Sequence, residues 1–212
     1  MNRALALALF AAATLPGAAS AQHWNLGVFG APQIVHSHID GSSSRLTGTV
    51  FGGEGTLVGE RFSVRLWYAQ GNVAEKSDSG LDKRLVVEGE ALVGLRATQW
   101  LTLWVGPTAR AYTLGETSQR WLLWTGRASA RGTLLPDRMQ TYVELWGALS
   151  GSVGDPSAKA SGRGADAGLE LRLSSQTPLW GRLGYRIESS HADALRETVE
   201  SITVTVIYGF PQ

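Results

Sequence analysis

The 212-residue sequence contains no cysteine, so neither a disulfide framework nor thiol chemistry is available to it. Lysine is scarce, because only three lysines stand against sixteen arginines. Beyond the first residues, no apolar run approaches the roughly 18–20 residues that a membrane-spanning helix requires. The 19 basic and 18 acidic side chains nearly balance, which argues against nucleic acid as a partner. The fold must therefore be stabilised by non-covalent packing alone.

The N-terminus has the pattern of a secretory signal peptide. A basic residue, Arg3, precedes an apolar run that ends at Leu15, and a triplet of small residues follows at 19–21. This pattern predicts export and cleavage, with residues 1–21 as the signal peptide and residues 22–212 as one domain. An uncleaved anchor or a buried helix is the alternative interpretation.

Alternation of apolar and polar residues dominates the remaining chain. In the stretch 201–210, Ile202, Val204 and Val206 share one face of an extended chain. Similar segments recur every 15–20 residues or so, separated by Gly, Ser, Asp and Pro, which predicts an all-β protein. The ten expected strands are 24–36, 45–58, 61–72, 84–97, 100–114, 120–134, 139–153, 165–175, 178–190 and 198–210. Eight strands plus an imperfect pair is the alternative, because Pro32 and Pro107 interrupt two segments.

The expected connections alternate between short and long. Short turns are predicted at 59–60, 98–99, 135–138 and 176–177. Longer polar loops are predicted at 37–44, 74–82, 115–119, 154–164 and 191–197. Short connections at one end and long ones at the other are typical of a closed antiparallel up-and-down transmembrane β-barrel, whose closure satisfies every backbone group in lipid.

Alternation alone does not say which face points inward, because a soluble lipocalin-like barrel has the same stripes with the apolar face inside. The charged face is rich in arginine and glutamate and lacks lysine, and arginine forms forked hydrogen bonds that suit a crowded interior. We therefore expect the apolar face to contact lipid and the charged side chains to fill a narrow lumen. The expected lumen network comprises Arg61, Arg65, Glu88, Glu90, Arg96, Arg110, Arg127, Arg131, Glu144, Glu170, Arg172, Arg182, Arg186 and Glu188.

Aromatic residues gather near the expected short turns, where an interfacial girdle would lie. They are Trp24, Phe62, Trp100, Tyr142, Trp180, Tyr208 and Phe210. Four others, Tyr68, Tyr112, Trp121 and Trp124, are expected nearer the opposite rim.

The end of the chain resembles the last strand of the small Gram-negative outer-membrane β-barrel proteins, which typically finishes on an aromatic residue recognised by the assembly machinery. Tyr208 and Phe210 match that pattern, whereas the extra Pro211 and Gln212 depart from it. The resemblance implies an outer-membrane location and contacts with lipids and the assembly machinery. We expect a monomer without a cofactor, and the sequence does not identify an extracellular partner.

Histidine and aspartate residues form a candidate site at the rim with the longer loops. His38 and Asp40 lie in the first long loop, and His191 and Asp193 open the last one. Closure of the barrel would bring the first and last strands together. These side chains could then form a metal site or the acid–base set of a hydrolase. Omptin proteases use Asp and His at such a rim, but their Asp-x-Asp pair is missing from this sequence. Lipid A deacylases use Ser, His and Glu, but their His-x-Ser-Asn pattern is missing too.

The sequence therefore favours a structural or surface-interaction role through external loops, with no assigned catalytic residue, metal or cofactor. A rim hydrolase and a soluble periplasmic carrier are the alternatives.

Overall fold

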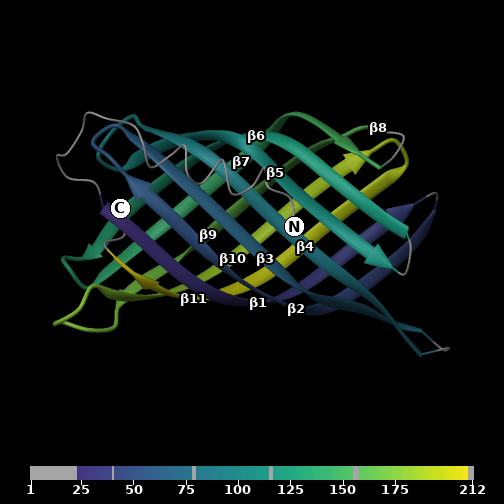
Figure 1. Ribbon diagram of the computed structural model, residues 1–212, viewed down its shortest axis with the longest axis horizontal. Coiled ribbons are helices and arrows are strands. Elements are labelled where there is room, and N and C mark those ends of the chain that lie inside the picture. Colours follow the sequence, from purple (N-terminus) through teal and green to yellow (C-terminus); the bar gives the residue numbers. More distant parts are fainter. Residues whose placement is uncertain (1–22, 40, 78–79, 115–116, 155–157, 210–212) are drawn as a thin grey trace, which may run out of the picture.

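The computed structural model describes residues 23–39, 41–77, 80–114, 117–154 and 158–209, and these ranges contain strands but no helix (Figure 1). The expected signal peptide lies outside the described residues. Within the described ranges, no helix is long and apolar enough to cross a membrane.

Ten long strands and one short strand make up the described part of the chain. The long strands are β1 (His23–Ile39), β2 (Ser42–Val58), β3 (Phe62–Ser77), β4 (Gly80–Arg96), β5 (Leu101–Leu114), β6 (Thr117–Leu135), β7 (Met139–Val153), β9 (Ser161–Arg172), β10 (Leu179–Ala192) and β11 (Leu195–Tyr208). The short strand, β8 (Ala158–Lys159), pairs with the end of β7. The prediction of ten strands is confirmed, and the alternative of eight is wrong.

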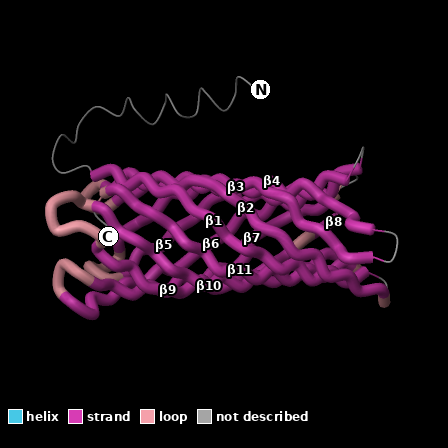
Figure 2. Tube along the Cα trace, turned by 90° about the horizontal axis from the view of Figure 1, so that it is seen from below, coloured by secondary structure: helices cyan, strands magenta, loops and turns pink. Residues whose placement is uncertain are grey.

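The strands close into a single antiparallel barrel. Long strands that follow one another in the chain are paired, and β1 pairs with β11 to complete the ring. The paired residues can be traced from strand to strand around the ring, starting at Gly30 of β1. In one direction the trace reaches Arg120 of β6, and in the other direction it reaches Gly132 of the same strand. This stagger of twelve residues tilts the strands by roughly 40°. The tilt produces the crossed pattern of front and back strands in Figure 2.

Alternation along each strand separates an outer wall from an interior. In β11, Ile202 and Val204 point outward and are exposed, whereas Val199 and Ile207 point inward and are buried. Side chains therefore alternate between the two faces with a period of two, as predicted, and β11 has apolar residues on both faces.

Each of the two prolines lies where one of the two β-ladders of its strand is interrupted. The pairing of β1 with β11 skips Ala31 and Pro32, while Pro32 stays in register with Thr49 of β2. The pairing of β4 with β5 likewise skips Pro107, which stays in register with Trp124 of β6. The missing N–H donor of each proline thus falls where the ladder is already interrupted.

The two ends of the barrel compare differently with the prediction, because the predicted short turns are present at one end whereas strands continue into the predicted long loops at the other. The terminal end, as we call it, contains the strand ends His23 and Tyr208 and the turns at 59–61, 97–100, 136–138 and 173–178. At the opposite, distal end the strands continue into the predicted long loops. The strand residues that flank the tips pair as Ile39 with Ser42, Ser77 with Gly80, Leu114 with Thr117 and Ala192 with Leu195.

The prediction of long loops at 37–44, 74–82, 115–119 and 191–197 is therefore wrong, and the predicted loop 154–164 contains β8 and the start of β9. The reason is compositional. Near the distal end the outer wall becomes polar, so the strands lose the apolar alternation by which they were recognised while keeping their backbone pairing.

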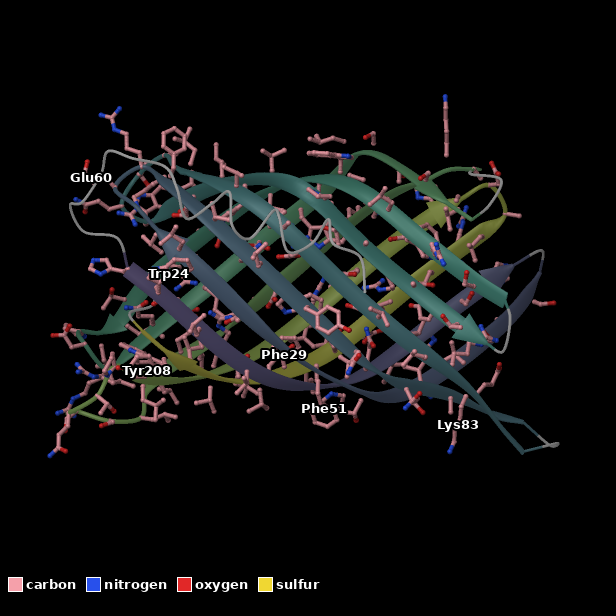
Figure 3. All side chains as sticks on the ribbon, viewed as in Figure 1. Trp24, Phe29, Phe51, Glu60, Lys83 and Tyr208 are labelled. Atoms are coloured by element: carbon pink, nitrogen blue, oxygen red, sulfur yellow. The ribbon has the colours of Figure 1, made fainter. Side chains whose placement is uncertain are left out.

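Large apolar side chains cover the outer wall between the two ends. Trp24, Phe62, Trp100 and Tyr208 are exposed near the terminal end, and Figure 3 shows Trp24 and Tyr208 far from Lys83 at the distal end. Other members of the predicted girdle and opposite rim differ: Tyr142, Trp180, Tyr112 and Trp121 point inward and are buried. Phe210 lies outside the described residues. Three outward aromatics, Trp24, Phe62 and Tyr208, thus remain at the terminal end, whereas Trp100 lies in a turn.

Candidate functional site

The interior of the barrel contains the densest set of polar interactions in the described chain, and it divides into two halves. The terminal half adjoins the terminal end, and the distal half adjoins the distal end. We describe the terminal half first.

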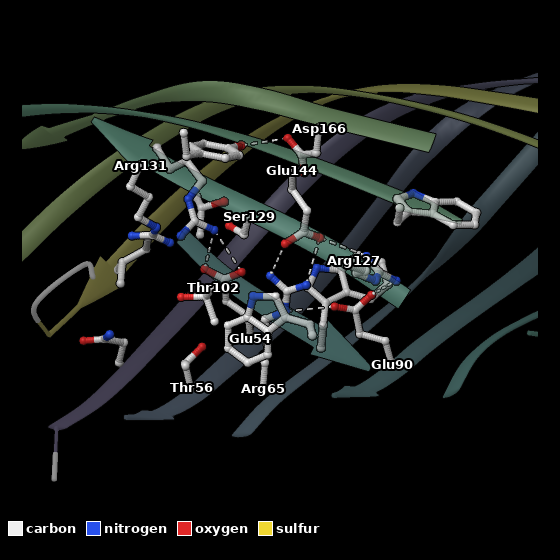
Figure 4. Close-up of a pocket in the computed structure, with 18 of the residues that line it drawn as sticks. Glu54, Thr56, Arg65, Glu90, Thr102, Arg127, Ser129, Arg131, Glu144 and Asp166 are labelled. Atoms are coloured by element: carbon white, nitrogen blue, oxygen red, sulfur yellow. Dashed lines mark hydrogen bonds and ion pairs between the residues drawn. The ribbon is translucent and has the colours of Figure 1, made fainter. Parts of the chain in front are cut away.

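Four charged side chains from four strands form a closed group in the terminal half. Arg65 of β3 donates through Nη1 and Nη2 to the two carboxylate oxygens of Glu144 of β7, at 2.8 and 2.9 Å. Its Nε lies 3.1 Å from Glu90 of β4. Arg127 of β6 contacts the same two carboxylates, at 3.1 Å for Glu144 and 2.6 Å for Glu90. Figure 4 shows Glu144 aimed at both guanidinium groups.

A second charged group lies closer to the terminal end. Arg182 of β10 contacts Glu54 of β2 at 2.7 Å and Glu170 of β9 at 2.8 Å. Arg131 of β6 contacts the other oxygen of Glu170 at 3.1 Å. Because each carboxylate faces a guanidinium from another strand, these contacts connect strands across the lumen.

Aromatic rings support the arginines of the interior. Arg65 stacks over Trp104 at 4.8 Å, Arg127 over Trp146 at 5.5 Å, and Arg182 over Tyr142 at 5.3 Å. Arg186 stacks over Trp67 at 5.2 Å. Such cation–π contacts hold a planar guanidinium in one orientation while its edge binds carboxylates.

Glycine makes room for one of these rings. A Cβ atom added at Gly94 would lie 2.5 Å from the ring of Trp104. The ring therefore occupies space that only a glycine on the neighbouring strand leaves open.

A cavity of about 310 Å³ occupies the terminal half. Its lining combines the two charged groups with Thr56, Thr102 and Ser129, and it extends to Arg96 and Trp100 near the terminal end. Charged groups beside such a polar cavity have access to water, which weakens the interaction between opposite charges.

In the distal half, a single guanidinium interacts with three carboxylates. Arg110 of β5 donates through Nε to Glu88 at 3.0 Å and through Nη1 to Glu197 at 3.2 Å, and its Nη2 contacts Glu188. Tyr112 donates to Glu197 at 2.9 Å.

Two neighbours complete this cluster. Gln33 donates to Glu88 at 2.8 Å, and Arg186 forms an ion pair with Glu188. Arg110 and all three of its carboxylate partners are buried. Each of these buried charges thus faces a charged or polar partner, as a dry interior requires.

Apolar side chains surround this buried cluster in the distal half. Val35, Val73 and Val86 are 0% exposed and Leu46 is 1% exposed. Trp121, Leu123 and Val199 belong to the same cluster of buried residues. The predicted network of charged side chains therefore shares the distal half with an apolar layer.

Most members of the predicted network form ion pairs in the interior, whereas three members form none among the described residues. Arg61 lies exposed in the turn between β2 and β3. Arg172 donates to the backbone oxygen of Ser174 at the end of β9. Arg96 lines the cavity without an ion pair among the described residues.

Sequence reasoning missed several partners. Glu197 falls in the predicted loop 191–197 but lies inside β11. Asp166 falls at the start of the predicted strand 165–175 but lies within β9, where it accepts a hydrogen bond from Tyr142 at 2.9 Å. Glu54 lies between two glycines, which hide the alternation of apolar and polar residues in this stretch. Its position could still have been inferred, because Glu54 and Thr56 are two positions apart and therefore lie on the same face of the strand.

The rim candidates are arranged differently from a catalytic set. His38 of β1 and His191 of β10 lie on either side of β11, and both are in register with Arg196. His191 lies 3.0 Å from the hydroxyl of Ser161, and no hydrogen bond joins the two histidines within the described ranges. Asp193 lies at the tip between β10 and β11, and Asp40 is outside the described residues.

No group of three or more His, Cys, Asp or Glu side chains in the described part of the chain is placed to hold a metal ion. The rim therefore presents separated histidines with an arginine between them.

Comparison with known proteins supports the fold and no closer relationship. No family model and no curated protein sequence matches the chain. Among solved structures, the outer membrane protease OmpT from Escherichia coli has a TM-score of 0.55 at 9% identity, covering 89% of this chain and 97% of that chain. An outer-membrane channel from Pseudomonas putida F1 has a TM-score of 0.50 at 11% identity, covering 93% and 98%.

Identities this low show a shared fold alone, so the protease activity of OmpT carries no argument here. The observed ring of paired strands agrees with both matches, and the apolar outer wall is the reverse of the soluble, lipocalin-like arrangement. The chain is thus a closed ten-stranded antiparallel barrel with the fold of the outer-membrane β-barrel proteins.

Proposed function

We propose that this chain is an integral outer-membrane protein whose lumen is closed, and that it has a structural or surface-interaction role instead of acting as a general porin. The apolar layer of the distal half, which we call the distal seal, carries this proposal. Val35, Val73, Val86 and Leu46 come from four different strands and are almost completely buried. A pore for hydrated solutes needs a continuous polar path, which this apolar layer would interrupt.

The charged groups support the same proposal. Arg65, Arg127, Glu90 and Glu144 contact one another across the lumen below the seal. An ion that entered the cavity from the terminal end would have to separate paired charges before it reached the apolar layer. Both barriers would then have to open for conduction.

Conductance measurement tests the closed lumen. Wild-type protein inserted into a planar lipid bilayer should show no step-like currents, while a general porin inserted in the same way serves as the positive control. Steady porin-like steps from the wild-type barrel would overturn the closed-lumen proposal.

Membrane insertion is tested separately by one matched pair of substitutions. Leu145 of β7 and Leu134 of β6 are both exposed on the outer wall, but Leu145 lies mid-strand and Leu134 next to the terminal end. In lipid, Leu145→Arg should reduce the free energy of unfolding by about 2–4 kcal/mol and Leu134→Arg by about 0–1 kcal/mol.

Urea titration in lipid vesicles, followed by the gel mobility of unboiled samples, measures both values. Equal effects at the two depths, or recovery of the wild-type protein in the soluble fraction, would contradict the membrane-spanning proposal.

A further inference from the structure

Basic side chains collect on one side of the outer wall near the distal end. We define the basic patch as Arg45, Arg163, Arg196, His36, His38 and His191. It spans β9, β10, β11, β1 and β2, which are consecutive neighbours in the barrel. The register places Arg45 opposite His36, and Arg196 between His38 and His191. Residues from distant parts of the sequence thus form one continuous surface.

The patch is exposed and has few acidic neighbours. All six side chains are exposed on the outer wall. No ion pair involves Arg45, Arg163 or Arg196 among the residues that the structure describes. Two acidic residues lie next to the patch. Glu200 is the outward carboxylate of β11 and accepts a hydrogen bond from Tyr185 at 2.9 Å, and Asp193 is exposed at the tip between β10 and β11. In contrast to the interior arginines, those of the patch therefore have free guanidinium donors.

A shallow hollow of about 270 Å³ lies within the patch. His36, His38, Arg45 and Arg196 line it together with hydroxyl side chains. The hydroxyl residues are Ser37, Ser43, Ser44 and Thr198. Guanidinium, imidazole and hydroxyl groups all donate hydrogen bonds, and a forked guanidinium matches the oxygen atoms of a phosphate group. The hollow thus offers donors to an anion.

The height of the patch on the wall indicates where that anion would lie. His36 lies twelve positions along β1 from Trp24, which is at the terminal end. At ~3.3 Å per residue and ~40° of tilt this is ~30 Å, slightly more than the ~25 Å apolar band of such barrels. Below the patch the wall is apolar, as at Val28 and Ile202. The patch is thus level with lipid headgroups.

We propose that the basic patch binds the phosphorylated headgroups of lipids in the membrane leaflet at the distal end, an inference that rests on the membrane-spanning part of the proposed function. Arg45 and Arg196 bind phosphate oxygens, and the hydroxyl groups of the hollow bind the polar remainder of the headgroup. The acyl chains pack on the apolar wall below. This combination selects a lipid over a free anion, because both parts of the molecule meet a complementary surface.

The test titrates detergent-purified protein with phosphatidic acid and measures retained lipid by native mass spectrometry, with phosphatidylcholine as the reference lipid. Wild-type protein should prefer phosphatidic acid, and the double variant Arg45→Gln/Arg196→Gln should bind it about tenfold more weakly. The charge-retaining variant Arg45→Lys/Arg196→Lys should recover most of the affinity.

The matched control lies on the far wall. Arg120 of β6 is also exposed and outward but lies outside the patch, and β6 is on the opposite side of the ring from β1. Arg120→Gln should leave the affinity for phosphatidic acid almost unchanged, and gel mobility of unboiled samples shows that each variant is folded.

Three outcomes would overturn the proposal: no preference for phosphatidic acid, equal losses in the patch and control variants, or complete displacement of the lipid by inorganic phosphate at the same concentration. The last would identify a soluble anion as the occupant. Porin-like conductance would end the closed-lumen proposal but would leave this titration unchanged, so the two proposals fail separately.

Discussion

The terminal and distal halves of the interior are built by the same strands, but they accommodate charge in different ways. In the terminal half, arginines and carboxylates share partners beside a polar cavity. There the side chain of Arg65 is 19% exposed, whereas those of Arg127, Glu90 and Glu144 are 8% exposed or less. In the distal half, Arg110 is 9% exposed and contacts three carboxylates inside an apolar layer.

This difference indicates that the surroundings of an ion pair determine how much stability is lost when one partner is removed. Water from the cavity can solvate a carboxylate that loses its partner, whereas an apolar layer cannot. Equivalent substitutions in the two halves should therefore have unequal effects.

The largest effect is expected for Arg110→Leu. The substitution leaves Glu88, Glu188 and Glu197 buried with too little compensating charge, so it should lower the free energy of unfolding by about 3–5 kcal/mol. Urea titration monitored by the gel mobility of unboiled samples measures the change. Arg61→Leu, in an exposed turn, is the control and should change stability by no more than about 0.5 kcal/mol.

Leu46→Ala tests the apolar layer itself. Leu46 is 1% exposed, and its truncation leaves a cavity, so a loss of about 3 kcal/mol is expected. The matched control Leu145→Ala faces outward, where lipid fills the space, and should be clearly milder. Similar losses at both positions would show that the distal half is not tightly packed.

Arg65→Leu provides the direct counterpart to Arg110→Leu. Glu144 and Glu90 each retain Arg127 as a partner, and the cavity admits water, so the expected loss is about 1.5–3 kcal/mol. The fluorescence of Trp104, over which Arg65 stacks, should also change. If Arg65→Leu proved as damaging as Arg110→Leu in the same urea titration, the contrast between the halves would fail.

The smallest effect is expected for Arg96→Gln. Arg96 lines the cavity without an ion pair in the described ranges, so the free energy of unfolding should stay within about 0.5 kcal/mol of wild type. A loss above about 1.5 kcal/mol would mean that the terminal half depends on charges beyond the two groups described above.

Much of this architecture follows from the sequence. Period-two alternation predicted the strands, and the arginine and glutamate residues on one face, such as Arg127 and Glu144, predicted the charged interior. Strand length was not predictable in this way, because β2 begins with three polar residues, the serines at 42–44, which fall in a predicted loop and show no apolar alternation. The distal seal was equally hidden, since an inward valine such as Val73 has no local feature that distinguishes it from a lipid-facing one.

The partners of each charge required the closed ring. Arg182 and Glu54 are separated by 128 positions in the sequence, and only the pairing of β1 with β11 brings their strands near each other. Missed partners such as Glu197 show the same limit, because a residue assigned to a loop could not enter a network of strand side chains.

The pairing of strands close to the distal tips has a consequence for attack by proteases. Residues on both sides of a tip, such as Ala192 and Leu195, are already held in the β-ladder. A protease needs several consecutive residues in an accessible, extended form, and exposed flexible tips are where nicking usually occurs. The tip between Ala192 and Leu195 should therefore resist brief digestion of the barrel in lipid vesicles, even though the wall rises above the apolar band.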